Sequence, residues 1–417
     1  MRLRRLELTI IAALFIGLSC GPRAVKPAQE HVVIYLVRSF PRKAISHVAA
    51  MVQQARRAGP CLWLVIDEDE DDRLWAAFSD EAAEAAFWNA SRVDAILPGR
   101  KWLRFGPDGL RRIADRLRCY LLAANLTDTL GTALAHPFMV RRLGPVTIGI
   151  TGLFADSEEV LIRQQGIRFQ DPEFTVGKTV PLLRMRADLI GVMVKPGTMT
   201  GHWNIDLTIG SESGKEISLP VPERWDRVRR LELLLVGGRV VDCAASEDDW
   251  PRVERDAAVF QIGESLRKGI DSLSAVKVVE SKVAVGPQVL TRALVQAILE
   301  DREIDGVLYD SLFATDTLRP GIITCGQLVS VLRDPERWAV LELSGREIKA
   351  LTQEKLVKAE WRKGAFRPRL LMNRSYRCLA SVGFLRRHPE FAAGGFRLSE
   401  RQFWQTAAEV LRKAGRR

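Results

Sequence analysis

The chain has 417 residues, of which 47% are hydrophobic, and a formal net charge of +11 from 62 Lys and Arg against 51 Asp and Glu. This length allows two or three separately buried cores, so we expect two domains rather than one. The cations are spread along the whole sequence, and there is neither a basic helix interleaved with aromatic residues nor zinc-finger spacing. This pattern argues against nucleic-acid binding. It favours a basic surface near an anionic membrane.

Residues 1–20 have the pattern of a lipoprotein-type signal or anchor. A positive "MRLRR" precedes the apolar "LTIIAALFIGLS", which is too short to span a membrane comfortably, and Cys20 follows small residues. We expect lipidation at Cys20; an uncleaved N-terminal anchor is the alternative. Either device exports the chain and tethers it to the periplasmic face of the cell envelope. Gly21, in the place of an inner-membrane retention aspartate, slightly favours the outer membrane.

From residue 31, apolar strands alternate with helices. "HVVIYLV" and "CLWLVID" predict buried strands, with a helix over residues 42–58 between them and another over residues 80–91 after them. The hairpin "RRLELLLVGGRVVDC", which turns at Gly237-Gly238, closes this unit. Nearly continuous apolar strands that alternate with helices are typical of an α/β layered domain. Further strands are expected in "VDAIL", "CYLLAANL", "GPVTIGITGLF", "ADLIGVMV" and "NIDLTIG", and a helix in "GPDGLRRIADRL".

The polar, acidic stretch "AASEDDWPRVERD" predicts a linker that passes into a helix, over residues 246–262 in all. The rest of the chain predicts a second, smaller α/β domain over residues 263–417. Its expected elements are helices over residues 288–302, 346–359 and 399–413, a strand over residues 338–345, and a strand that opens "YRCLASVGFL".

The cysteines after Cys20 match no zinc or haem spacing. In an oxidising compartment some of them can pair, and Cys61 and Cys119 each begin an apolar strand, so a bridge between neighbouring strand ends is one interpretation. Buried, unreactive thiols are the other. The odd number leaves at least one thiol free; the five are Cys61, Cys119, Cys243, Cys325 and Cys378.

Five segments in chain order carry a resemblance to a known family. They are "VDAILPGRKWLRFGPDGL", "CYLLAANLTDTLGTALAHPFMVRRLGPVTIGITGLF", "YDSLFATDTLRPGIITCGQLVSVL", "WAVLELSGREIKALTQ", and "YRCLASVGFL" with the "FAAGG" after it. In this order they resemble the bacterial 5′-nucleotidase and UDP-sugar hydrolase family. The resemblance implies an α/β fold, with a four-layer metallophosphoesterase-like sandwich over residues 31–245 and a smaller nucleotide-binding α/β domain over residues 263–417.

The resemblance also implies two divalent metals, held by side chains at the strand ends of the first domain. In the family the first strand ends in Asp-x-His-Gly, where this chain has Arg38 and Phe40. The second ends in Gly-Asp, which leaves Asp67 in the place of the bridging carboxylate. The third ligand pair, Asn-His, is replaced by Arg100 and Lys101.

The two remaining ligand positions are also changed. A histidine becomes Lys195, and the last Gly-His-x-His becomes Gly210 followed by Ser211, Glu212 and Ser213. Ammonium and guanidinium groups have no lone pair to offer a metal, so only the ligand at Asp67 survives. Asp67 also begins an acidic run, and a solvated surface is the alternative interpretation of that residue.

If the fold is as implied, four cations, Arg38, Arg100, Lys101 and Lys195, converge where the metals would lie. Such a cluster is costly when dry and unpaired, so we expect it to be open to water, paired with Asp67 and Glu212, or occupied by an anion.

The nucleotide site implied for the second domain also differs from the family's pattern. The family's phosphate-binding arginine aligns near Thr315. Trp338 is one candidate for the first base-stacking aromatic, although it begins a strand and packing is the alternative. Phe396, after Gly394-Gly395, matches the second.

These substitutions predict a catalytically inactive binding or scaffold module of the envelope, with no cofactor and with an envelope protein as a possible partner. Two alternatives stay open. One is an active phosphohydrolase that holds divalent metal with Asp67, Glu212 and the nearby His202, although an ordinary loop histidine is the simpler interpretation of His202. The other is a receptor for phosphate, nucleotides or a related small anion, built on the four cations and Phe396.

Overall fold

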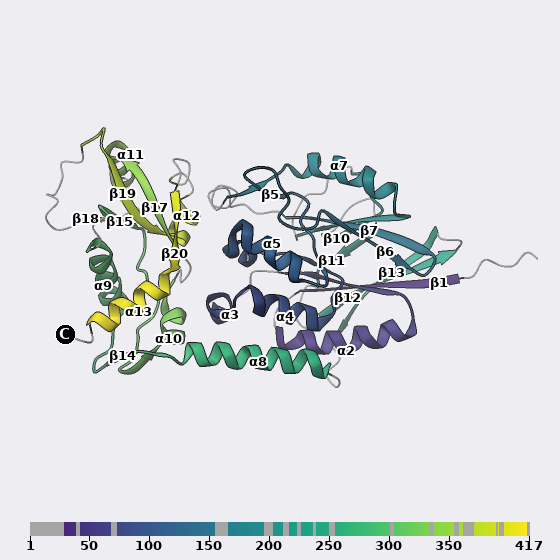
Figure 1. The fold of residues 1–417 in the computed structure, drawn as a ribbon, viewed down its shortest axis with the longest axis horizontal. Helices are drawn as coiled ribbons and strands as arrows, with labels where there is room; N and C mark the ends of the chain where they lie inside the picture. Colours follow the sequence, from purple (N-terminus) through teal and green to yellow (C-terminus); the bar gives the residue numbers. More distant parts are fainter. Residues whose placement is uncertain are drawn as a thin grey trace, which may run out of the picture.

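Two sheets and the helices around them form the larger part of the molecule (Figure 1). The computed structural model describes residues 29–38, 42–67, 73–154, 166–195, 203–211, 217–222, 227–236, 239–249, 255–300, 304–333, 337–353, 358–361, 371–388, 391 and 396–414. Five residues with expected roles lie outside these ranges: Cys20, Phe40, His202, Glu212 and Ser213.

The first sheet has six strands in the order β13-β12-β1-β2-β3-β4. Strands β1 to β4 are parallel, as their continuous apolar sequences predict, and β12 adds to β1 in the antiparallel sense and turns back into β13. The expected pairing of the two hairpin strands is therefore confirmed; the turn expected at Gly237-Gly238 lies outside the described residues. The bounds are β1 Gln29–Arg38, β2 Cys61–Ile66, β3 Ala95–Leu97, β4 Tyr120–Leu121, β12 Arg227–Val236 and β13 Arg239–Asp249.

The second sheet has five strands in the order β11-β10-β9-β7-β6, parallel except for β6. Alternate residues of the two sheets face each other and form one buried cluster, in which Ile34, Leu64 and Ile66 lie opposite residues such as Ile148 and Ile209. The bounds are β6 Phe138–Leu143, β7 Val146–Leu153, β9 Leu189–Val194, β10 Leu207–Gly210 and β11 Ile217–Pro220. A short pair, β5 Leu126–Asp128 and β8 Ile167–Phe169, lies apart.

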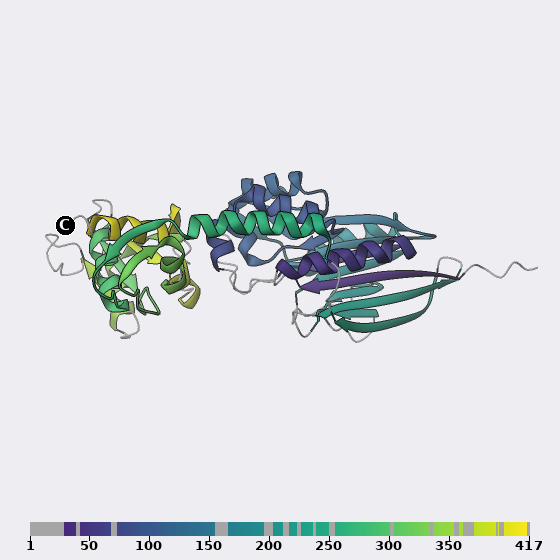
Figure 2. The same ribbon diagram turned by 90° about the horizontal axis from the view of Figure 1, so that it is seen from below.

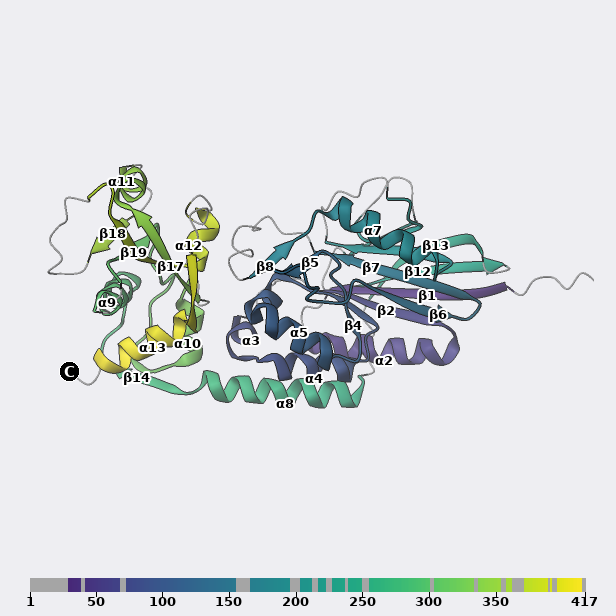
Figure 3. The same ribbon diagram turned by 45° about the horizontal axis from the view of Figure 1, so that its top comes forward.

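Helices cover the outer faces of both sheets, which makes four layers (Figure 3). Helix α7 covers the second sheet, and the others lie on the side of the first. The expected four-layer α/β sandwich is confirmed. The bounds are α2 Arg42–Ala58, α3 Arg73–Phe78, α4 Glu81–Ser91, α5 Gly106–Arg116, α7 Pro172–Arg184 and α8 Ala257–Ser274.

Helix α8 runs along the first unit and leads into the second (Figure 2). Residues 246–249, which were expected in the linker, complete β13, because their backbone pairs with β12. The helix also continues past residue 262 to Ser274, since it packs on α2, α3 and α4. No helix in the described part of the chain is long and apolar enough to cross a membrane.

The second unit is built on a five-stranded sheet in the order β18-β15-β19-β17-β20, with buried clusters on its two faces. The helix expected over residues 346–359 ends at Gln353, and residues 358–361 pair with β15 as a strand. The closing helix begins at Phe403, because residues 396–402 pair with β17. The bounds are β14 Lys277–Ser281, α9 Pro287–Leu299, β15 Gly306–Tyr309, β16 Gly321–Thr324, α10 Cys325–Val331, β17 Arg337–Ser344, α11 Gly345–Gln353, β18 Lys358–Trp361, β19 Ser375–Ser381, α12 Val382–Arg387, β20 Phe396–Gln402 and α13 Phe403–Ala414.

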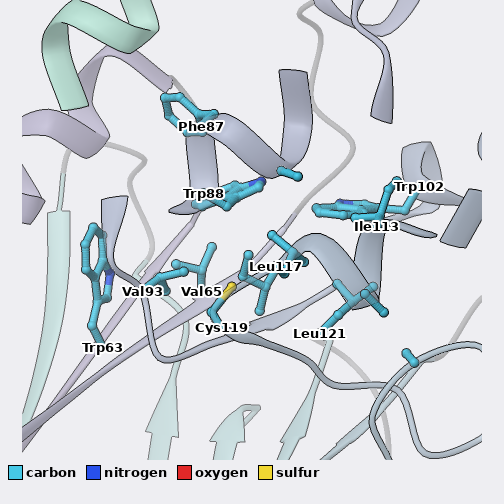
Figure 4. Packing of buried hydrophobic residues seen from close by; sticks show 14 of the residues in the cluster. Trp63, Val65, Phe87, Trp88, Val93, Trp102, Ile113, Leu117, Cys119 and Leu121 are labelled. Atoms are coloured by element: carbon cyan, nitrogen blue, oxygen red, sulfur yellow. The ribbon is translucent and has the colours of Figure 1, made fainter. Parts of the chain in front are cut away.

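All five cysteines of the described residues are free thiols. The possible bridge between Cys61 and Cys119 is wrong, because β3 lies between β2 and the strand that Cys119 precedes. Both side chains are buried in the core of the first unit, and Figure 4 shows Cys119 among its apolar residues. Burial raises the pKa of Cys119 to about 12, which makes it an unreactive thiol at neutral pH.

Candidate functional site

The carboxyl ends of strands from both sheets meet at one edge of the sandwich. Gly210, the last residue of β10, has φ of +100°, and a Cβ atom there would overlap the Val194 carbonyl oxygen and the Ile66 side chain. Only glycine allows these three strand ends to come so close. Because Asp67, Lys195 and Ser211 each follow one of these ends by one residue, the backbone brings the three positions to the same edge.

Asp67 is completely buried, and protein groups satisfy both of its carboxylate oxygens. Its Oδ1 accepts a hydrogen bond from Lys101 Nζ at 2.8 Å, and its Oδ2 accepts one from Trp102 Nε1. Its backbone N–H donates to the Leu97 carbonyl at 2.9 Å, which ties the end of β2 to the end of β3. The interpretation of Asp67 as part of a solvated acidic surface is therefore wrong.

A short 3₁₀ helix, η1 (Arg100–Phe105), delivers Lys101 and Trp102 to this carboxylate. It starts directly after β3 at the extended residue Gly99, whose carbonyl accepts a hydrogen bond from Trp102 N–H at 3.2 Å. The Trp102 ring is fully buried and packs in the cluster that contains Ile113 (Figure 4). Trp102 is a site residue that sequence reasoning missed; its only signal was its place next to Lys101.

Lys195 is held by an aromatic ring at the end of β7. Its Nζ lies 4.8 Å from the centroid of the Phe154 ring, a cation–π contact. The buried Asn125 fixes Phe154, since its amide accepts a hydrogen bond from Phe154 N–H at 2.8 Å and donates one to Phe154 C=O at 2.7 Å. Asn125 was also missed. It lies in the "AANL" segment, for which the sequence predicts a strand but no role in the site.

The other expected cations lie on the same edge. Arg38 ends β1 in parallel register with Ile66, and Arg100 opens η1; both side chains are partly buried. Ser211, also partly buried, directly follows Gly210.

The residues expected to bind a nucleotide in the second unit have mostly structural surroundings. Thr315 bonds through its hydroxyl and its N–H to the Val331 carbonyl. Trp338 is 2% exposed and packs edge-on against Phe403, so a base-stacking role for it is wrong. Phe396 begins β20 and packs partly buried against the cluster on one face of the sheet.

The described residues do not fit a pair of divalent metals. No three His, Cys, Asp or Glu side chains in the described ranges lie close enough together to hold one. At Asp67, the residue expected in the place of the bridging carboxylate, an ammonium and an indole N–H already engage both oxygens, and neither group can bind a cation.

The fold is that of known hydrolases. The structure is similar to that of a Staphylococcus aureus protein described as a 5′-nucleotidase, with a TM-score of 0.64 and 14% identity over 91% of this chain and 96% of that one. The chain has the 5′-nucleotidase fold. A 5′-nucleotidase precursor of Thermus thermophilus gives a TM-score of 0.57 and 14% identity, over 92% of this chain and 97% of that one.

A third protein with this fold, the Thermus thermophilus sulfate thiohydrolase SoxB, matches with a TM-score of 0.51 and 17% identity, over 89% of this chain and 80% of its own. By sequence, no family model and no curated protein matches the chain. The 5′-nucleotidase fold therefore extends over nearly the whole chain, while the side chains at its strand ends differ from a two-metal centre.

Proposed function

We propose that this protein is a member of the 5′-nucleotidase family in which an internal ion pair has replaced the metal centre, and that it acts as a binding or scaffold module rather than as a hydrolase. The contact between Lys101 and Asp67 carries the proposal. A buried carboxylate needs a positive partner, which in a two-metal hydrolase is the metal. Here Lys101 supplies that charge from the loop that would hold metal ligands.

The surroundings of Asp67 support a structural role for it. Removing a carboxylate from water costs several kcal/mol unless charge and hydrogen bonds compensate it, and Lys101 and Trp102 provide both. A carboxylate so engaged has no oxygen turned toward a substrate or water. The Lys101 pair also leaves fewer cations for an anion, which weighs against the alternative of a phosphate or nucleotide receptor.

The proposed setting is the cell envelope, through lipidation at Cys20, with an envelope protein as the partner of the module. Metabolic labelling with palmitate is expected to label the full chain and not its Cys20→Ala variant. A full chain that takes up no label would contradict lipidation and support an uncleaved anchor.

A hydrolysis assay tests the loss of catalysis. The chain is incubated with Mn²⁺ and a panel of nucleoside monophosphates, UDP-sugars and bis-p-nitrophenyl phosphate, beside Asp67→Ala as the matched control. Phosphate from the monophosphates, UMP from the UDP-sugars and p-nitrophenol from the diester are measured, and we expect the rates of the two proteins to be equal and independent of the metal. Metal-dependent release that Asp67→Ala abolishes would contradict the proposal and favour an active phosphohydrolase.

A further inference from the structure

A cavity of about 420 Å³ lies where the two units of the molecule meet, away from Asp67 and Lys195. Its walls come from both units: Phe78 ends α3, Leu273 lies near the end of α8, and Trp404 and Ala408 belong to α13. This volume is in the range of small-molecule sites in proteins.

The walls of the cavity are mostly apolar, with Gln405 and Arg412 as the polar lining residues. The Phe78 and Trp404 rings meet edge to face, 5.0 Å between centroids, across the junction. Leu273 and Val276, which also line the cavity, are 49% and 45% exposed, so they present apolar surface that the chain itself leaves uncovered. An apolar group placed here would remove that surface from water.

One cation stands at this apolar wall. Arg412 lines the cavity one helical turn after Ala408, on the same side of α13, and is exposed. It makes no ion pair with any residue in the described part of the chain. The nearby Cys325 thiol does not neutralise it, because burial raises the pKa of that thiol.

We propose that this cavity binds a small amphipathic anion, with its apolar tail between Phe78, Leu273 and Trp404 and its carboxylate or phosphate head on Arg412. Such a ligand touches both units and holds them together. The inference does not depend on the function proposed for the site at Asp67, since the two sites share no residue.

Calorimetric titration of a chain that begins at residue 22 tests the proposal. This chain retains every buried cluster of the described fold, because all five draw only on residues from Val32 onward. The probes are octanoate and octyl phosphate, with octanol and octylammonium as neutral and cationic counterparts. Saturable binding of at least one anion, about 10-fold tighter than that of octanol and octylammonium, is the expected result.

Two substitutions locate the site. Arg412→Gln is expected to weaken anion binding about 10-fold, and Val276→Trp, which fills the cavity from its exposed rim, to abolish it. Lys413→Gln is the matched control, since Lys413 is 70% exposed on the same helix and is absent from the cavity wall. The proposal is overturned if neither anion binds saturably, if octylammonium binds as well as the anions, or if Arg412→Gln, melting at the temperature of the unchanged chain, binds with unchanged affinity.

Discussion

The Asp67 carboxylate and the Lys101 ammonium depend on each other for their burial. The carboxylate has no exposed surface, and the lysine side chain is 19% exposed. Removing Lys101 alone would leave the buried carboxylate without its ammonium partner, so this single change should cost more stability than removing both charges together.

Removal of Lys101 alone is therefore expected to destabilise the fold. Lys101→Met should lower the free energy of unfolding by about 3 kcal/mol, measured by urea denaturation, because it removes the ammonium group that is bonded to the buried Asp67 carboxylate. The double variant Asp67→Asn with Lys101→Met should recover part of the loss. Arg112→Met, which breaks the exposed pair with Glu81, is the control and should change little. Equal losses in the single and the double variant would contradict this account.

A second carboxylate, Asp310, makes stability depend on pH. Burial by itself would raise the pKa of Asp310, but hydrogen bonds from Arg387, Ser311 and His388 and the Arg387 charge outweigh it and lower the pKa to about 2. A depressed pKa stabilises the fold above the unfolded pKa of about 4, and this contribution is lost as the pH falls from about 4 to about 2.

Asp310→Asn is expected to remove that dependence. It should be about 2 kcal/mol less stable than the unchanged chain at pH 7 and equally stable near pH 2, by urea denaturation at each pH. Asp108→Asn, at a carboxylate that is 83% exposed, should keep the original profile. A parallel offset of Asp310→Asn at every pH would contradict the assignment to this carboxyl group.

At the scale of elements, the close approach of β2, β9 and β10 depends on one glycine. Gly210→Ala is expected to lower the free energy of unfolding by at least about 2 kcal/mol, since the methyl group meets backbone and the positive φ strains an L residue. Gly269→Ala in α8 is the matched control, because nothing lies within 4 Å of its added Cβ, and it should stabilise by about 0.5–1 kcal/mol. Thermal melting of both variants checks this; a neutral Gly210→Ala would show that the strand ends are not so tightly joined.

The strands and helices of the first unit could be predicted because each has a local signal. Continuous apolar runs mark β1, β2, β7 and β9, and helix α2 has the bounds that its amphipathic spacing predicts. Residues 358–361 have helix-compatible composition, and only pairing with β15 makes them a strand. Tertiary contacts determine the secondary structure of such segments, and these contacts cannot be read from the local sequence.

In the candidate site, too, some features could be predicted from the sequence and others depend on tertiary contacts. The positions of Asp67, Lys101 and Lys195 follow from the order of the strands. The roles of Trp102 and Asn125 could not be predicted in this way, because both side chains contact segments that are distant in sequence. Trp102 and Asp67, for example, are 35 residues apart. The sequence predicts cations at these strand ends but leaves open whether they are open to water, paired with Asp67 or occupied by an anion. The structure shows that Lys101 is paired with Asp67.

At the scale of the whole molecule, the two units are joined by more than a linker. Helix α8 packs along the first unit and contacts α10 of the second, and α10 also contacts α3. In Figures 1 and 2 the second unit lies beyond the end of β1, the strand whose last residue is Arg38. The 5′-nucleotidase fold thus spans both units.

The claim that Lys101 takes the place of a metal beside Asp67 is tested most directly by calorimetric titration of the chain that begins at residue 22 with Mn²⁺. The account predicts no saturable Mn²⁺ binding, and titrations of the unchanged chain and of Asp67→Ala that cannot be distinguished. Saturable binding of one or two Mn²⁺ ions per chain, lost in Asp67→Ala, would contradict it.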